Sequence, residues 1–387
     1  MAATYNVSPD VLNWVFQKAQ NNPLPLKSIP LLQAWIDGTK VPTFSQIEDV
    51  SNETRIPLGY FFLNTPPEEK IPLLQFRTVK SEQYKDPSRN LIDTIHDMER
   101  IIDWTKNSMI ESNSEPNEVV GSQRNVKDPL VLANYIRRIL GLNIDWAIYS
   151  HSAEESFKIL RDRINSVGVI VMQNGTARGN SKRPLDVNEF RAFTIIDNYA
   201  PLIFINACDS QNAKLFSLLH EFAHICIGVD SLFNENHWHS HPNNNVVEIL
   251  CNAVAAELLV PTEPFRNKWQ ELKPTCSSTD DIIEKTAYYF KCGQVVVARK
   301  ASDLGLINKE KYNQIANTAK QQYLDAKGRK NSSGGNYYAT MASRIDRRFF
   351  NMLLESVLQG KTQYTEACKL TNTNRITFSE LAERMAI

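Results

Sequence analysis

The chain has 387 residues, 42% hydrophobic and 22% charged, an ordinary composition for a globular protein of two or three domains. Lysine plus arginine equals aspartate plus glutamate at 43 each, so no bulk basic charge points to nucleic acid. Without an 18-residue apolar run, a secretory leader or paired cysteine spacing, we expect a cytoplasmic protein that has no membrane partner.

The first 78 residues are predicted to form a small helical domain. Apolar residues recur at helical spacing, and proline and glycine interrupt the pattern. Helices are expected over residues 8–19, 43–54 and 58–63, and a further short helix is expected to end near residue 38. The segment "TPPEEKIP" at 65–72 then predicts a linker.

The next part of the chain is predicted to be a helical connecting region, residues 79–165. Beyond it the hydrophobic period changes. Short β-branched segments bounded by turn residues predict strands over 167–175, 189–196 and 201–207. These strands and two following helices form a predicted core at 166–275. A helical extension and a C-terminal helical unit are expected over 276–330 and 331–387.

One helix carries chemistry that a purely apolar core does not need. Residues 215–228 read "LFSLLHEFAHICIG", with His220 and His224 one turn apart on the same face. Two imidazoles so placed can bind one metal ion. Glu221 is rotated by about 100° from His220 and would lie beside the metal rather than on it. This H-E-x-x-H arrangement is typical of zinc peptidases.

A catalytic zinc usually has three protein ligands and an open position for water. The best candidate for the third ligand is Glu248, on the helix predicted over 245–259. A rival, Glu257, follows nine residues later and about half a turn off that face, so we expect a solvated charge there. Cys251, one turn from Glu248, is expected to be a small buried residue rather than a ligand.

The stretch "HWHSH" places His237, His239 and His241 at alternate positions of a predicted loop. One interpretation is a surface loop with incidental metal binding. The other is that one of these histidines reaches the open site and stabilises the oxyanion of a tetrahedral intermediate. The sequence leaves both interpretations open.

The region from about 165 to 262 resembles the ImmA/IrrE metallopeptidase family. The likeness rests on "IFIN", the HExxH helix and the later "EILCNAVAAELLVP". By position, His220 and His224 resemble the zinc histidines of that family, Glu221 its catalytic glutamate and Glu248 its third ligand. The resemblance implies a Zn²⁺ cofactor and cleavage of a regulatory protein, commonly a repressor encoded nearby. Some members of the family act as antitoxins beside a nuclease toxin.

The N-terminal segment "AWIDGTKVPTFSQIEDVSNETRIPLGYFFL" resembles the Xre-type helix-turn-helix domain that often precedes this peptidase. The resemblance implies DNA binding through residues 1–78, but basic residues are sparse there, so protein docking is the favoured expectation and DNA binding the alternative. The chain is predicted to be an α+β protein, mainly helical. A small-sheet zincin-like metallopeptidase core would lie between the helix-turn-helix-like domain and the C-terminal helical unit.

The predicted activity is water-mediated peptide hydrolysis with Glu221 as the base. The strand at 201–207 is expected to be an edge strand, to which a substrate strand could pair by β-augmentation. The alternative function is an antitoxin or transcription regulator that acts by protein or DNA binding, with the zincin fold mainly structural.

Overall fold

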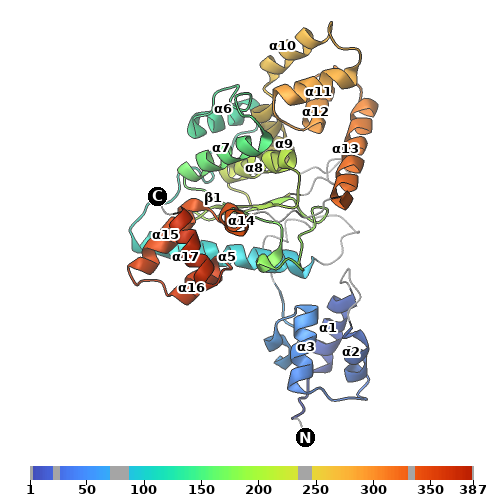
Figure 1. Cartoon of the computed structure of the whole chain (residues 1–387), viewed down its shortest axis with the longest axis vertical. Coiled ribbons are helices and arrows are strands. Elements are labelled where there is room, and N and C mark those ends of the chain that lie inside the picture. Colours follow the sequence, from blue (N-terminus) through green and yellow to red (C-terminus); the bar gives the residue numbers. More distant parts are fainter. Residues whose placement is uncertain (1–2, 21–26, 70–86, 234–245, 330–335, 386–387) are drawn as a thin grey trace. The chain divides into compact units, whose positions relative to one another are not determined.

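A computed structural model describes residues 3–20, 27–69, 87–233, 246–329 and 336–385 of the chain. These residues divide into two compact units, Met1–Ile95 and His96–Ile387 (Figure 1). Each unit has a hydrophobic core of its own. The domain boundaries expected from the sequence are finer than this division and remain predictions.

The first unit is helical, as its sequence predicts. Its elements are α1 (Pro9–Gln20), α2 (Ile29–Ile36), α3 (Phe44–Thr54) and the 3-10 helix η1 (Leu58–Phe62). A capping box fixes the start of α3, since the Thr43 hydroxyl accepts from Gln46 N–H and the Gln46 side chain accepts from Thr43 N–H. Fully buried side chains from every element form the core, among them Val11, Val15, Leu32, Ile47 and Phe61.

The second unit is mostly helical and contains one small sheet, which confirms the predicted α+β class. Its helices before the last strand are α5 (Arg89–Glu111, which begins in the first unit), α6 (Pro129–Leu140), α7 (Ala153–Ser166), the 3-10 helix η2 (Ala177–Gly179) and α8 (Gln211–Ile227). The later helices are α9 (Val246–Leu259), α10 (Thr262–Leu272), α11 (Thr279–Tyr289), α12 (Gln294–Asp303), α13 (Lys309–Arg329), α14 (Tyr337–Arg344), α15 (Arg347–Leu358), α16 (Tyr364–Leu370) and α17 (Arg375–Met385).

The sheet has four strands in the order β1-β3-β2-β4. Their bounds are β1 (Ile170–Asn174), β2 (Ala192–Ile195), β3 (Leu202–Asn206) and β4 (Ser231–Phe233). Strand β1 pairs parallel to β3, and β2 pairs antiparallel to both β3 and β4. The prediction that the strand near 201–207 lies at an edge is therefore wrong. Every residue of β3 is buried, as its unbroken apolar run requires in a central strand.

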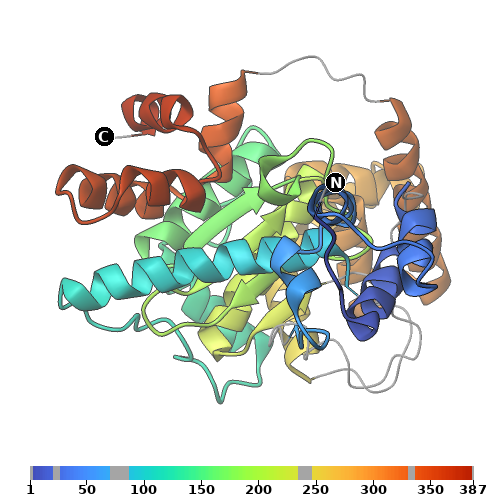
Figure 2. The same cartoon turned by 90° about the horizontal axis from the view of Figure 1, so that it is seen from below.

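Helices cover both faces of the sheet (Figures 1 and 2). Side chains alternate along each strand, so each face has its own set. Val171, Ile203 and Ile205 join the core that contains α7, α8 and α9. Phe193 and Phe204 alternate with residues of that set and stack on each other with ring centroids 5.0 Å apart. In Figure 2, α5 crosses in front of the sheet, on the face opposite α8. The candidate site lies on the α8 side.

The C-terminal helices close one edge of the sheet. Asp346, at the N-cap of α15, is fully buried, and its carboxylate accepts from the backbone N–H of Val171 in β1 at 2.8 Å. Gln173 donates to the carbonyl of Ser343, and Arg161 donates to the carbonyls of Ser343 and Ile345. Because Asp346 occupies the N–H of Val171 and the chain from Ser343 to Asp346 lies along β1, that edge is covered and not open to another strand.

None of the described helices combines the length and the apolar character that crossing a bilayer requires. The structure also contains elements that the sequence did not predict, namely β4 and α10. Strand β4 has only three residues, too few to show the alternation by which strands are found.

Candidate metal centre

The helix that carries the H-E-x-x-H motif, α8, is buried along almost its whole length. The Ser210 hydroxyl caps its start by accepting from Ala213 N–H, and Gly228 ends it in the left-handed conformation with φ 81°. A Cβ at Gly228 would meet the Cα of Gly121 at 2.9 Å, so both the conformation and the space require glycine. A helix that is apolar on all sides fits this central place in the core.

The three polar residues of the motif are inside this core. His220 and Glu221 are fully buried, and His224 is 1% exposed. The two imidazole rings have centroids 4.8 Å apart, as expected for positions one turn apart on a helix. Buried polar groups of this kind destabilise a fold unless they have partners, so their presence calls for an explanation.

Helix α9 brings a carboxylate to these rings. Its Glu248 lies with one oxygen 3.3 Å from His220 Nε2 and the other 3.3 Å from His224 Nε2. One ligand atom from each of the three residues lies within 4.8 Å of the other two. The structure thus brings together the three residues that the sequence proposed as ligands, with Glu248 on α9 lying 24 positions after His224 on α8.

This donor set fits a divalent metal. Two imidazole nitrogens and a carboxylate oxygen converge on one point, which is the three-ligand pattern of catalytic zinc sites. The side chain of Glu248 is 38% exposed while both histidines are buried, so the point is reached from one side. Such access leaves room for a fourth, exchangeable position.

The electrostatics of the four residues agree with distinct roles. Burial raises the pKa of Glu221, against the opposing effect of His220 and His224. Both oxygens of the Glu221 carboxylate are buried, and neither has a hydrogen-bond partner among the described residues. Burial alone would raise the pKa of Glu248, but the bonds from His220 and His224 lower it below its usual range. The pKa values of the two carboxylates are thus shifted in opposite directions, down for Glu248 and up for Glu221.

Residues 170–302 match the IrrE N-terminal-like domain of the peptidase M78 family. The matched part of the chain contains His220, Glu221, His224 and Glu248, and its similarity suggests a metallopeptidase. Residues 345–384 match a domain of unknown function, DUF8813, which begins at the edge of the sheet closed by Asp346. Comparison with the curated proteins and with the solved structures finds no match.

The rival ligands lie elsewhere in the matched part of the chain. The prediction that Glu257 is a solvated charge is wrong, because it is 6% exposed. Its carboxylate accepts from Lys300 Nζ at 2.5 Å and from the Thr262 hydroxyl at 2.7 Å, and Arg137 Nη2 lies 3.8 Å away. Cys251 is buried, as predicted. The candidate oxyanion stabilisers His237, His239 and His241 lie outside the described residues.

The sequence did not reveal the residues that bond to the C-terminal end of α9. The guanidinium of Arg137 donates to the carbonyl of Glu257 at 2.6 Å, and the indole N–H of Trp146 donates to the carbonyl of Leu258 at 3.0 Å. These bonds satisfy carbonyls at the C-terminus of the helix that carries Glu248. No local pattern could have identified them, since Arg137 is 120 residues from Glu257 in the chain.

Thr194 is a further residue beside the motif that the sequence did not single out. It is fully buried in β2, and its hydroxyl donates to the backbone carbonyl of Glu221 at 3.3 Å. Its partner across the strand pair is Ser231 of β4. The sequence offered one signal for this contact, a threonine between the apolar residues of "RAFTII". A hydroxyl at an inward position of a strand needs a hydrogen-bond partner.

Proposed function

We propose that this protein is a metal-dependent regulatory endopeptidase, with zinc as the preferred metal. His220, His224 and Glu248 would hold the ion, and Glu221 would be the catalytic base. The observation that carries the proposal is the convergence of the three ligand atoms within 4.8 Å, beside a buried carboxylate that has no hydrogen-bond partner among the described residues.

When bound, zinc would polarise the scissile carbonyl and lower the pKa of a water molecule. Glu221 would accept a proton from that water and pass it to the leaving amine. Burial raises the pKa of Glu221, which makes this carboxylate a stronger base than one in solvent. The hydrogen bond from the Thr194 hydroxyl to the backbone carbonyl of Glu221 would limit the movement of Glu221.

The proposed substrate is a segment of a partner protein in extended conformation. Strand β3 is central and the outer side of β1 is occupied by Asp346, so neither can accept a new strand. Strand β4 is at the other edge and pairs with β2 alone among the described strands. A substrate strand would therefore add along β4, which follows the motif helix directly.

The resemblance to the ImmA/IrrE family supports a repressor or a component of a toxin system as the partner. The competing proposal is a protein that acts by binding alone, as an antitoxin or a transcription regulator. The presence of Glu221 distinguishes the peptidase proposal from the binding-only proposal. A structural metal site needs its three ligands, but it does not need a buried, unliganded carboxylate next to them.

The test compares metal content and function in matched variants. Purified wild-type protein should contain about one metal ion per chain, and His224→Ala should lose most of it. Glu221→Gln should retain the metal and lose cleavage of the partner by about 10²–10⁴-fold, the usual effect of removing an acid–base group. Metal at full stoichiometry in His224→Ala would refute the ligand assignment. Full biological function in a metal-replete Glu221→Gln would favour the binding-only proposal.

A further inference from the structure

The helix that carries Glu248 has a second polar residue beside the candidate metal centre. Asn252 follows Glu248 by four residues on α9, so the two side chains lie on one face of the helix with their Cβ atoms about 5–6 Å apart. Glu248 in turn lies 3.3 Å from both His220 and His224. The side chain of Asn252 therefore lies one helical turn from the residue that completes the candidate ligand set.

The side-chain oxygen of Asn252 is buried, and no hydrogen-bond donor among the described residues reaches it. The residue as a whole is only partly buried, so it lies at the boundary between the core and the surface. A buried amide oxygen without a partner destabilises a fold, and such a group in a native protein calls for an explanation. The candidate ligand set does not explain it, because that set consists of His220, His224 and Glu248.

The place of Asn252 distinguishes it from similar asparagines. Asn313 and Asn351 also have a buried side-chain oxygen for which the described part of the chain supplies no partner. They lie on α13 and α15, helices that contribute no residue to the candidate ligand set. Asn252 alone of the three shares a helix face with a candidate ligand, so its unused oxygen adjoins the position at which a substrate would react.

The face of α9 beyond Asn252 has small side chains. At about 100° per residue, Ala256 continues the line that runs from Glu248 through Asn252, and Ala253 lies beside that line. Both alanines are partly buried. Ile249, the residue after Glu248, is 52% exposed. This side of α9 thus combines a polar group, small neighbours and one apolar contact next to the candidate metal centre.

We propose that Asn252 binds the main chain of the substrate beside the scissile bond, an inference that rests on the proposed peptidase function. A carboxamide has both a donor and an acceptor, so it can bond to the N–H and the carbonyl of peptide groups. Asn252 would hold an extended segment in line with the metal position, and Ile249 would contact an apolar side chain of that segment. A bound substrate would give the Asn252 oxygen the partner that it needs.

The test uses the zinc-loaded full chain and two probes. Acetohydroxamate has a zinc-chelating group alone, whereas acetyl-alanyl-alanyl-leucine hydroxamate adds a peptide main chain to the same group. In calorimetric titrations, Asn252→Ala should weaken the peptidyl probe by ~5–10-fold, as for the loss of hydrogen bonds, and leave the affinity for acetohydroxamate unchanged. Asn351→Ala is the matched control, since it removes an equivalent unpartnered oxygen from α15, and it should change neither affinity.

The stability of the metal-free protein separates substrate binding from a structural role. Asn252→Leu replaces the amide by an apolar side chain of similar shape, so the melting temperature should stay the same or rise. Zinc content after loading should also equal that of wild type, because Asn252 is not a ligand. A lower melting temperature in both Asn252→Ala and Asn252→Leu would overturn the inference.

The two probes also separate a failure of this inference from a failure of the proposed function. Equal losses of both probes in Asn252→Ala would overturn the inference, because the residue would then act through the metal site. An unchanged affinity of this variant for the peptidyl probe would do the same. If wild type binds the peptidyl probe no more tightly than acetohydroxamate, the inference fails while the metal site stands. If wild type binds neither zinc nor hydroxamate, the proposed function fails, and the inference fails with it.

Discussion

Replacing Asp346 by alanine should release the C-terminal helices from the sheet. The Asp346 carboxylate is fully buried and accepts from Val171 N–H of β1 at 2.8 Å and from Phe349 N–H of α15 at 2.9 Å. Burial raises the pKa of Asp346, against the opposing effect of Arg161. One side chain thus caps a helix and satisfies a backbone N–H at the edge of a sheet.

The cost can be estimated from these separate contacts. Loss of an N-cap costs about 0.5–2 kcal/mol, and a buried N–H left unpaired at Val171 costs about 1–3 kcal/mol. We therefore expect Asp346→Ala to lower the free energy of unfolding by about 1.5–5 kcal/mol, the sum of these two losses. Asp346→Asn retains one acceptor oxygen and should cost less.

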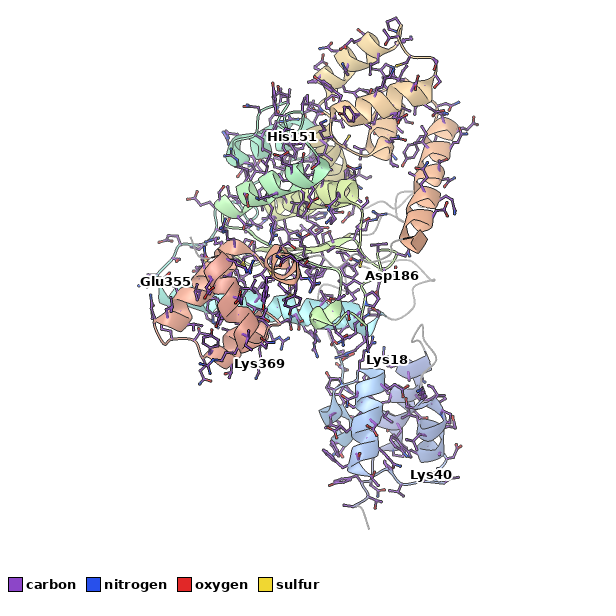
Figure 3. All side chains as sticks on the ribbon, in the orientation of Figure 1. Lys18, Lys40, His151, Asp186, Glu355 and Lys369 are labelled. Atoms are coloured by element: carbon purple, nitrogen blue, oxygen red, sulfur yellow. The ribbon has the colours of Figure 1, made fainter. Side chains whose placement is uncertain are left out.

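Hydrogen exchange together with denaturant unfolding would check this prediction. Amides of β1 and of α15 should exchange faster in Asp346→Ala, because the edge opens before the sheet unfolds. Glu355→Ala is the matched control, since it removes an exposed carboxylate from the same helix (Figure 3) and should change stability by less than about 0.5 kcal/mol. Unchanged β1 protection in Asp346→Ala, or equal losses in both variants, would refute the role of Asp346 as an edge cap.

Three further predictions concern the second unit. Gly228→Ala should lower the free energy of unfolding by more than about 2 kcal/mol, because the strain of the left-handed backbone adds to a 2.9 Å contact. Gly305 is also left-handed but has open space around it, so Gly305→Ala should lower this free energy by only about 1 kcal/mol. Thermal unfolding of the two variants would measure the difference. A chelator should lower the melting temperature of wild type but not of His224→Ala, because a bound metal stabilises only the folded state. Burial alone would raise the pKa of Glu257, but Lys300 and Thr262 together lower it. The stabilising effect of the ionised Glu257 is therefore present above about pH 4.3 and is lost as the pH falls further. The stability difference between wild type and Glu257→Gln in urea titrations should therefore shrink at acid pH and not at alkaline pH.

The candidate site was predictable because its information is local. His220, Glu221 and His224 lie within five consecutive residues, and the helical period alone determines which of them face together. Glu248 required one further step, the assumption that a second helix packs against the first. The structure brings Glu248 to 3.3 Å from both histidines, which the sequence could propose but not measure.

The residues that the sequence missed depend on contacts across long separations. Lys300 and Arg137 surround Glu257 from α12 and α6, so a glutamate that is half a turn off the ligand face is buried rather than solvated. Periodicity describes which way a side chain points on its own helix, and it cannot show what packs against the other side. The same limit explains why β3 was predicted to be an edge strand: its partner residues in β1 lie 32 positions earlier in the chain.

The two edges of the sheet differ in a way that bears on the proposed activity. At β1, Asp346 occupies the outward backbone N–H of Val171, and the Gln173 side chain bonds to Ser343 beside it. At β4, Ser231 pairs with Thr194, and Thr194 in turn bonds to Glu221. Three strands would therefore separate a strand added at β4 from the edge strand β1, and the added strand would lie next to β4, whose Ser231 pairs with the residue that contacts Glu221. Because the C-terminal helices remove the other choice, they would direct an extended segment to the one edge that adjoins the candidate metal centre.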